Sequence, residues 1–559
     1  MPKQLGSLKC LKTLTNFVVG EGSGSSIREL GKLKNLSGAL SISQLQNVIP
    51  PKDALNVGLR DKKYLDKLAL EWAATTPRSE SERILLESLR PHTSLKRLTI
   101  KSYGGGIFPN WVGHHSFSCI TSIHLDECRN VCSLPPFGQL CSLKELSIIG
   151  LNGVVTVGRE FCGNSSTGSS SIHPFGGLKV LRFEQMSGWK EWLSSSSAEN
   201  EGGAFLDLKE LCIRNCPKLT GGLPIHIHSL AKLLIDSCPK LVASLLRNQL
   251  GAMSGNARIA LVELPSGRQK LEVRGVNEVA SLEGIMDSNS RLQELQINYC
   301  ESLVSLPWGG PLSALKSVRI KWSSKLELPI DTNYSSLETL SLRGSCDSLR
   351  FFPLELFPKL KDLTIVRCGN LECLTVPEQH ERHLVISNIQ IVGCDKFVSF
   401  PKGGLCAPSL TSLEVLYCRS LTLLPDKMHL LLPSLLTLRI SGSGQMESFP
   451  EGGLPSNLNS LRISDGDKLF VNRIGWGLQN LSSLTTFEIS GESEGVESFP
   501  EAGLLHTGLI NLRIYHFRDL KSLDKNGFQH LTSLQKLDLG WCEKLEHMPE
   551  GACPPPFHL

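Results

Sequence analysis

The segments LQELQINYCESLVSLP (residues 292–307) and LTSLEVLYCRSLTLLP (residues 410–425) decide the fold of this chain. Both place leucine, two residues, leucine, one residue and a further aliphatic residue in the same order, and both continue with cysteine, a second pair of leucines and proline. The alternation at the centre points two aliphatic side chains to one face of a short strand and the residue between them to the other. The recurrence predicts a chain built from one repeated unit.

The same unit returns along most of the sequence. The last aliphatic residue of each predicted strand serves as a marker, and the markers are Ile100, Leu125, Ile148, Phe183, Ile213, Ile235, Ile297, Ile320, Leu342, Ile365, Ile391, Val415, Ile440, Ile463, Ile489, Ile514 and Leu539. From Ile297 onward they are 22 to 26 residues apart, within the leucine-rich-repeat period of roughly 20 to 29 residues. One repeat cannot bury its leucines alone, so neighbouring repeats must stack. We therefore expect an α/β repeat solenoid, a leucine-rich-repeat horseshoe with a parallel β-sheet on its concave face and irregular or 3₁₀ convex segments.

The whole chain, residues 1–559, is predicted to be one leucine-rich-repeat domain with no nucleotide-binding domain. Residues 1–94 hold N-terminal repeats in which the pattern turns helical twice, over Asp53–Lys63 and over Ser79–Leu89. The second segment opens with a capping box of Ser79 and Glu82. We expect both helices to lie on the convex side.

The remaining repeats differ in regularity. Residues 95–250 are interrupted by Ser/Gly-rich insertions at Gly163–Ser171 and Ser194–Gly203, which we expect to be mobile loops. Residues 251–559 hold more regular repeats, although Gly251–Lys270 lacks a clear copy of the unit.

The first leucines already fall within repeat spacing directly after Met1, at Leu5, Leu8, Leu11 and Leu14. Solenoid ends need a polar cap, and the sequence shows none here. We therefore expect a fragment or a truncated product whose preceding part is missing.

Half of the 18 cysteines share one place in the repeat. They follow the marker by three residues at Cys128, Cys216, Cys238, Cys300, Cys368, Cys394, Cys418 and Cys542, and by four at Cys346. A small group with a weak S–H donor suits a chain that turns inward as it leaves the strand. We expect these thiols to be buried, reduced and inert. Zinc binding is the rival interpretation, but the spacing of about 24 residues lacks the C-x-x-C pairs that zinc sites favour, so we expect no metal site.

Charge and hydropathy narrow the classes of function. The formal net charge is +4 for 559 residues, too small for long-range attraction to nucleic acid or to an anionic membrane. The sequence shows no signal peptide and no apolar stretch long enough to span a bilayer. We expect a cytoplasmic or nucleocytoplasmic protein without a membrane span.

The residue directly before or after each marker is predicted to face outward on the concave sheet. These positions contain a basic run, preceded along the chain by His124, Asp126 and Glu184. Stacked arginines repel one another, which makes sense if an acidic protein surface binds there; the alternative is that strand faces in water simply carry charge. Aromatic residues near this face are candidate contact anchors, and Trp541 is a further one. The predicted partner-binding residues are Arg319, Lys321, Trp322, Arg343, Arg367, Tyr417, Arg439, Arg462, Arg513 and Tyr515.

Several phrases go beyond a generic repeat. They are LTNFVVG (14–20), ILLESLRPHTSLKRLTIKSYGGGIFPNWV (84–112), LPPFGQLCSLKELSIIG (134–150), VGREFCG (157–163) and LRFEQMSGWKEW (181–192). Together they resemble the repeat region of plant nucleotide-binding leucine-rich-repeat disease-resistance proteins of the coiled-coil class. The resemblance implies part of an intracellular immune receptor that senses a pathogen effector or a guarded host protein and restrains its own nucleotide-binding domain.

The chain departs from that family in one respect. It contains no G-x-x-x-x-G-K-[ST] phosphate loop, so ATP or ADP would bind only in a missing upstream domain and no cofactor is predicted for the residues present. No catalytic constellation emerges, and we expect a binding protein and not an enzyme. Two other functions stay open: a substrate-recruiting adaptor of a ubiquitin ligase, and nucleic-acid binding through the basic run, which the low net charge disfavours.

Overall fold

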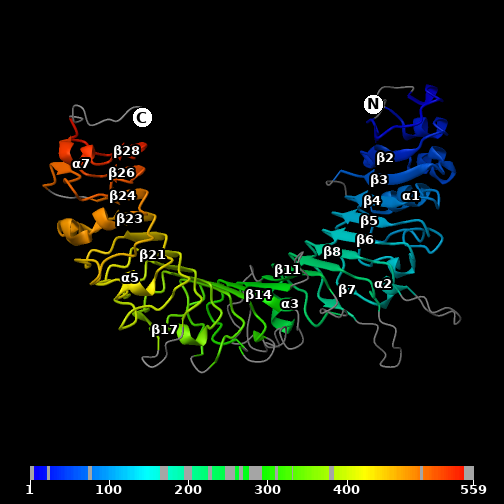
Figure 1. The fold of residues 1–559 in the computed structure, drawn as a ribbon. Helices are drawn as coiled ribbons and strands as arrows, with labels where there is room; N and C mark the ends of the chain where they lie inside the picture. Colours follow the sequence, from blue (N-terminus) through cyan, green and yellow to red (C-terminus); the bar gives the residue numbers. More distant parts are fainter. Residues whose placement is uncertain are drawn as a thin grey trace. The chain divides into compact units, whose positions relative to one another are not determined.

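The computed structural model describes residues 5–21, 25–73, 79–163, 174–193, 204–223, 230–245, 258–263, 269–275, 292–306, 308, 312–329, 332–376, 383–491 and 495–546. The chain divides into two compact units, residues 1–279 (unit 1) and residues 280–559 (unit 2). Within each unit, short strands lie side by side in chain order (Figure 1). The inserted loops expected at Gly163–Ser171 and Ser194–Gly203 lie, apart from Gly163, outside the described residues.

Unit 2 is a ladder of parallel strands with one strand per repeat. Its strands are β14 (Leu292–Asn298), β15 (Ser317–Lys321), β16 (Thr339–Arg343), β18 (Asp362–Val366), β20 (Asn388–Val392), β21 (Ser412–Leu416), β22 (Thr437–Ser441), β23 (Ser460–Ser464), β24 (Thr486–Ser490), β26 (Asn511–Tyr515) and β28 (Lys536–Gly540). The markers lie opposite one another at every step from Ile297 to Leu539. This confirms the predicted stacking.

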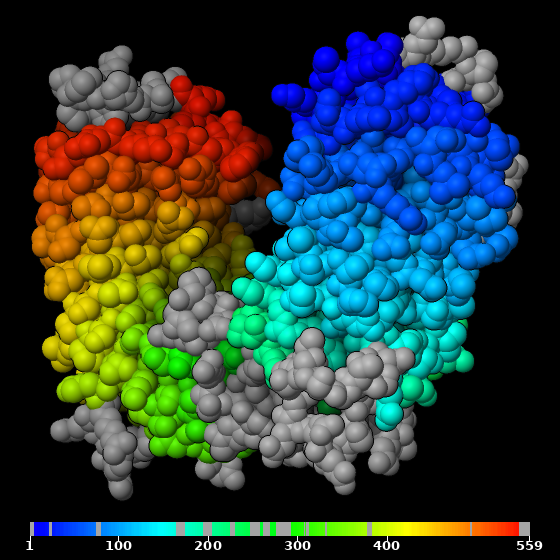
Figure 2. Space-filling model, turned by 90° about the vertical axis from the view of Figure 1, so that its right-hand side faces the viewer, coloured from blue at the N-terminus to red at the C-terminus, as the bar shows by residue number. Residues whose placement is uncertain are grey.

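The markers form the core of unit 2. From Ile297 to Ile514 none of them is more than 2% exposed. Burial of one such side chain contributes about 1.5 to 3 kcal/mol, and each coil buries it against its two neighbours. In Figure 2 the coils of each unit form successive layers in chain order, each covered by the coils before and after it. Only the last strand, β28, is less deeply buried.

Unit 1 follows the same plan over most of its length. Its strands are β1 (Asn16–Val18), β2 (Gly38–Ser43), β3 (Leu65–Glu71), β4 (Arg97–Lys101), β5 (Ser122–Asp126), β6 (Glu145–Ile149), β8 (Val180–Glu184), β10 (Glu210–Arg214), β11 (Lys232–Asp236), β12 (Arg258–Glu263) and β13 (Gln269–Arg274). From β1 to β11 the pairing is parallel.

The expectation of a wholly parallel sheet is wrong at the end of unit 1. Strand β12 pairs antiparallel with both β11 and β13. Only residues 264–268 separate β12 from β13, whereas parallel neighbours need a crossover of about a dozen residues or more. The segment that lacked a clear repeat copy thus contains an antiparallel strand in place of a regular coil.

The segments between the strands are mostly turns and 3₁₀ helices, as expected for the side opposite the sheet. The 3₁₀ helices are η1 (Leu5–Ser7), η2 (Ile27–Lys32), η3 (Leu45–Asn47), η4 (Pro51–Val57), η5 (Leu59–Asp61), η6 (Phe137–Gln139), η9 (Leu354–Leu356), η10 (Arg473–Trp476) and η11 (Leu478–Asn480). The α-helices are α1 (Ser79–Ser88), α2 (Arg159–Cys162), α3 (Pro239–Leu245), α5 (Met428–Leu431), α6 (Asp467–Val471) and α7 (Lys525–Gln529). None of the helices formed by the described residues has the length and apolar character needed to cross a bilayer. Short parallel pairs join β7 (Thr156–Val157) to β9 (Glu191–Trp192), β17 (Phe351–Pro353) to β19 (Cys373–Thr375), and β25 (Ser498–Phe499) to β27 (Ser522–Leu523).

One of the two predicted N-terminal helices forms and the other does not. Helix α1 matches the segment expected over Ser79–Leu89. Over Asp53–Lys63 the chain forms the 3₁₀ helices η4 and η5, separated by Gly58 in the left-handed conformation. The left-handed Gly58 ends η4 and precedes η5, so the two segments do not join into one continuous helix. In α1, the Glu82 carboxylate accepts a hydrogen bond from the Gly104 backbone N–H; the Ser79 side chain of the predicted capping box lies outside the described residues.

The third residue after each marker turns inward, and we call this position the inward slot. Its side chain hydrogen-bonds to the preceding coil. Ser323 Oγ accepts the Cys300 N–H at 3.2 Å, and Ser345 Oγ accepts the Ser323 N–H at 3.2 Å. The Cys418 thiol lies 3.8 Å from the Ile391 carbonyl of the coil before it. From Cys300 to Cys418 the slot holds a small polar group, either cysteine or serine, whereas other coils fill it with an apolar side chain, as at Leu151, Met186 and Phe517.

Eight of the nine cysteines occupy this slot as predicted, although Cys542 is only partly buried, and the prediction is wrong for Cys346. Ser345 occupies the slot in that coil and is fully buried, while Cys346 is buried one residue further on. The slot cysteines are free thiols. Burial raises the pKa of Cys394 to about 12 and that of Cys418 to about 11, so these thiols stay protonated and unreactive at neutral pH.

We predict that Ile365→Ala, in the middle of unit 2, lowers the free energy of unfolding by roughly 2 to 5 kcal/mol, because it leaves a cavity between coils. Thr364→Ala is the matched control on the same strand, since Thr364 faces outward and is only partly buried; it should cost less than about 1 kcal/mol. Urea unfolding followed by circular dichroism measures both. Equal costs would mean that the strand does not present Ile365 to a core.

We predict that Ser345→Ala lowers the free energy of unfolding by roughly 1 to 3 kcal/mol, because the buried Ser323 N–H loses its acceptor. Ser345→Cys should be tolerated better, since cysteine fills the same slot at Cys368 and Cys394. The two variants are compared by their midpoints in urea. If alanine proves as stable as cysteine, the hydrogen bond does not explain the choice of residue in the slot.

Candidate functional site

The outward-facing residues of the strands form the open face of each unit. In unit 2 the residues directly before the markers make one continuous row across neighbouring strands: Gln296, Arg319, Ser341, Thr364, Gln390, Glu414, Arg439, Arg462, Glu488, Arg513 and Asp538. This row contains four of the predicted partner-binding residues. It also contains carboxylates at the same offset from the marker, so the row is mixed and not basic.

Three of the predicted arginines are neutralised within this row. Arg439 lies 3.1 Å from a Glu414 carboxylate oxygen. Arg462 and Arg513 share Glu488 at 3.4 and 3.2 Å, and Arg513 also lies 3.4 Å from Asp538. The expected repulsion between stacked arginines is therefore wrong for these three. The carboxylates were missed because only basic residues were read from the outward positions, although the same offset would have found them.

Four other predicted cations lack the carboxylate partner that these three arginines have. Arg319, Lys321, Arg343 and Arg367 form no ion pair with any residue in the described part of the chain. Lys321 and Arg343 are opposite one another at the last positions of β15 and β16. The first coils of unit 2 thus carry uncompensated positive charge on the open face.

The second residue after each marker adopts a left-handed backbone conformation in most coils. Trp322, Arg367 and Tyr417 have φ of 53°, 52° and 54°. Arg367 was expected on the outward face of its strand, and this placement is wrong by one residue. Val366 directly follows the marker and is only 8% exposed, whereas Arg367 lies beyond the strand, where the turn directs it to solvent.

Glycines in the following coils make room for these side chains. A Cβ atom on Gly344 would lie 2.4 Å from Trp322 Cε3, and one on Gly442 would lie 2.8 Å from Tyr417 Cδ1. Both contacts are too close for a larger residue. The Trp322 and Tyr417 side chains therefore lie across the backbone of the next coil, which fixes their orientation.

We call Lys321, Trp322, Arg343, Arg367 and Tyr417 the edge patch, because they lie where strands β15 to β21 end. Trp322 is 37% exposed and Tyr417 57% exposed, and Arg343 and Arg367 are exposed as well. Exposed aromatic and guanidinium groups held in fixed positions are typical of protein-binding hot spots.

The last predicted residue, Tyr515, lies several coils away from the edge patch. It is on β26, and its ring is 6.4 Å from that of Trp541. The Trp541 ring stacks on His516 at 4.6 Å. Burial and the nearby Asp538 raise the pKa of Tyr515, so it remains a neutral phenol.

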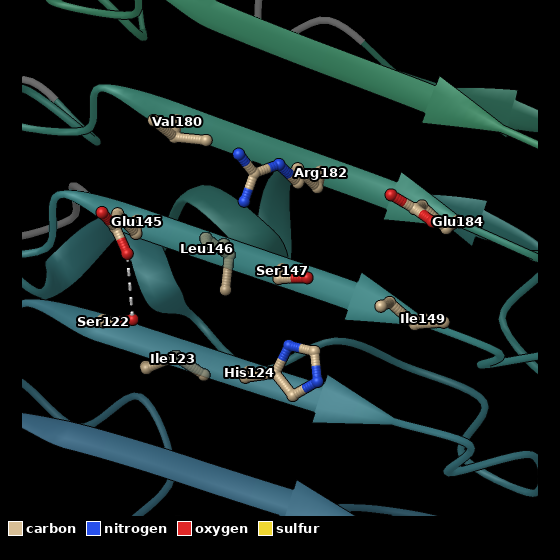
Figure 3. Close-up of a pocket in the computed structure, with 10 residues that line it drawn as sticks. All are labelled: Ser122, Ile123, His124, Glu145, Leu146, Ser147, Ile149, Val180, Arg182 and Glu184. Carbon is tan, nitrogen blue, oxygen red and sulfur yellow. Dashed lines mark hydrogen bonds between the residues drawn. The ribbon is translucent and has the colours of Figure 1, made fainter. Parts of the chain in front are cut away.

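Unit 1 has a cavity of about 420 Å³ on its own open face, over β5, β6 and β8 (Figure 3). Apart from the buried Ile123 and Leu146, the lining residues occupy outward positions of these strands and include His124, Glu145, Arg182 and Glu184. The sequence predicted that His124 and Glu184 face outward, but it did not predict a cavity between them. Arg182 was missed although it directly precedes its marker Phe183, and Glu145 was missed because it lies three residues before its marker Ile148.

The groups in this cavity are largely engaged with one another or with nearby strands. Ser122 Oγ lies 3.5 Å from Glu145 Oε2, and Arg182 lies 3.8 Å from Glu210. Burial lowers the pKa of the half-buried His124, although Asp126 acts in the opposite direction. The cavity therefore places the imidazole of His124 among the carboxylates of Glu145 and Glu184 and the guanidinium of Arg182.

Among the described residues, no group of three or more histidine, cysteine, aspartate or glutamate side chains lies close enough to hold a metal ion.

Comparisons with known proteins agree with this architecture. Residues 27–151 match the family model of the R13L1/DRL21 leucine-rich repeats. The Arabidopsis thaliana disease resistance protein At3g14460 is 30% identical over 98% of this chain and 50% of its own length. The Arabidopsis thaliana disease resistance RPP13-like protein 1 is 31% identical over 73% of this chain and 32% of its own length. The Solanum bulbocastanum disease resistance protein RGA4 is 36% identical over 39% of this chain and 21% of its own length.

The chain thus spans at most half the length of these relatives. Its strand ladder and its matched residues identify it as a leucine-rich-repeat region of the plant nucleotide-binding leucine-rich-repeat disease-resistance family.

Proposed function

We propose that this chain is the protein-recognition and autoregulatory region of an intracellular plant immune receptor. It binds a pathogen effector or a guarded host protein, and it holds the receptor's nucleotide-binding domain inactive until that partner arrives. The chain itself binds and does not catalyse. The observation that carries the proposal is the similarity to At3g14460, which extends over nearly the whole chain.

The open faces support a binding role. A repeat fixes its inward positions by packing and leaves its outward positions free to vary, so binding specificity can change without disturbing the core. In unit 2 these positions carry exposed arginines and aromatic residues at the edge patch. Such residues contribute most of the binding free energy in protein interfaces.

Autoregulation requires that the partner and the nucleotide-binding domain prefer different states of the receptor. A partner shifts the equilibrium only by the difference between its affinities for the two states. A tenfold shift therefore needs about 1.4 kcal/mol of differential binding. An extended open face has enough outward positions to contact both a partner and a second domain.

The test begins with mapping the 5′ end of the transcript that encodes this chain. We predict an in-frame upstream segment that contains a phosphate loop. An upstream helical domain that binds a ubiquitin-ligase scaffold would contradict the receptor proposal and favour the adaptor.

The regulatory part is tested in leaf tissue with the full-length product. Deletion of this chain should cause cell death without a pathogen, because the nucleotide-binding domain loses its restraint. Supplying residues 1–559 as a separate polypeptide should suppress that cell death. If the separate chain has no effect although it accumulates and associates with the upstream part, the autoregulatory proposal is wrong.

A further inference from the structure

We propose that the edge patch binds a short acidic polypeptide segment displayed by a partner protein. The proposal rests on the proposed function and adds the chemistry of the partner. Its components are the side chains of Lys321, Arg343 and Arg367, which supply charge, and those of Trp322 and Tyr417, which supply apolar contact.

Lys321, Arg343 and Arg367 form no ion pair with any described residue. On strands β14 to β18 themselves the carboxylates are Glu294 and Asp362, which lie in the row three positions before the markers. Four residues separate that row from Lys321 and Arg343, a distance of roughly 13 Å along a strand. This exceeds the Debye length of about 8 Å at physiological salt. In the later coils, by contrast, each outward arginine has a carboxylate within 3.4 Å.

Trp322 and Tyr417 are large residues at a position, the second after the marker, that neighbouring coils fill with glycine. Neighbouring coils place Gly344, Gly393 and Gly442 there, and glycine adopts positive φ without steric cost. Trp322 and Tyr417 adopt the same conformation with large side chains that remain substantially exposed. The left-handed conformation is shared by most coils, so it is the size and exposure of these two side chains, and not backbone strain, that indicate a binding role.

The small extent of the edge patch favours an acidic protein segment over a nucleic acid as the ligand. A nucleic-acid strand needs a continuous track of cations along its phosphates, together with stacking platforms for its bases. Here the unpaired cations end at Arg367, and the following coils carry Gln390, Glu414 and the paired arginines. A compact patch of three cations between two aromatic rings fits a few carboxylates with an apolar side chain among them.

The test uses a fluorescein-labelled peptide of sequence EEFEEFEE and the whole chain, with binding followed by fluorescence anisotropy. We expect saturable binding that weakens between 50 and 300 mM salt, because the attraction is between charges exposed to solvent (about a threefold or greater loss of affinity). Arg343→Glu combined with Arg367→Glu should weaken binding at least about tenfold, since two attractive charges become repulsive.

Two further double variants keep the result interpretable. Trp322→Gly with Tyr417→Gly should weaken binding at least about threefold without lowering the midpoint of urea unfolding, because glycine relieves the left-handed conformation. Lys359→Glu with Lys402→Glu is the matched control: both lysines are exposed in turns of unit 2, and the same change in net charge there should alter binding less than about twofold.

Three results would overturn the proposal: equal binding of the uncharged peptide QQFQQFQQ, unchanged affinity of the Arg343→Glu, Arg367→Glu variant, or tighter binding of an eight-residue oligothymidylate than of the acidic peptide. These results are independent of the transcript mapping. A missing upstream phosphate loop would refute the receptor role and leave peptide binding intact, whereas absence of peptide binding would leave the receptor role standing.

Discussion

Every feature of this protein depends on the burial of aliphatic side chains between neighbouring coils. A strand of five residues such as β18 buries Leu363 and Ile365 on one face and has no other element of its own to cover them. The coils before and after supply that cover. Because side chains alternate along a strand, a slip of one residue would expose the entire apolar set. The stacking therefore fixes the register as well as the fold.

A fixed register also fixes the surface. Once the markers are aligned, residues at equal offsets from them form rows, and each row has its own environment. The inward slot becomes a row of small hydrogen-bonding groups. The second residue after the marker becomes a row of left-handed turns, and at Trp322 and Tyr417 a large side chain lies over a glycine of the next coil. The outward aromatic side chains of the edge patch are thus oriented by the same stacking that buries the core.

The sequence predicts the fold well because the repeat encodes register directly. The offsets of Ile297, Ile320 and Leu342 alone give the strand pairing that the structure shows. It predicts less where the repeat is absent. The antiparallel strand β12 lies in a stretch without a clear copy, and its direction depends on the short connection to β13. The slot in the coil of Leu342 follows the spacing: Ser345 is the third residue after the marker and accepts the Ser323 N–H, whereas assigning Cys346 put residue type before spacing.

The candidate site was predictable in its position and only partly in its chemistry. Offsets from the markers place Arg343 and Arg439 on one face, but they do not show which of the two has a carboxylate beside it. That depends on the residue at the same offset one coil away. Glu414 pairs with Arg439 across adjacent strands, whereas the strands beside Arg343 offer Lys321 and the buried Val366. A net charge of +4 therefore says little about binding. What matters is that neutralisation is local to each pair of coils, so a chain that is nearly neutral as a whole can keep a small, strongly positive surface at one place.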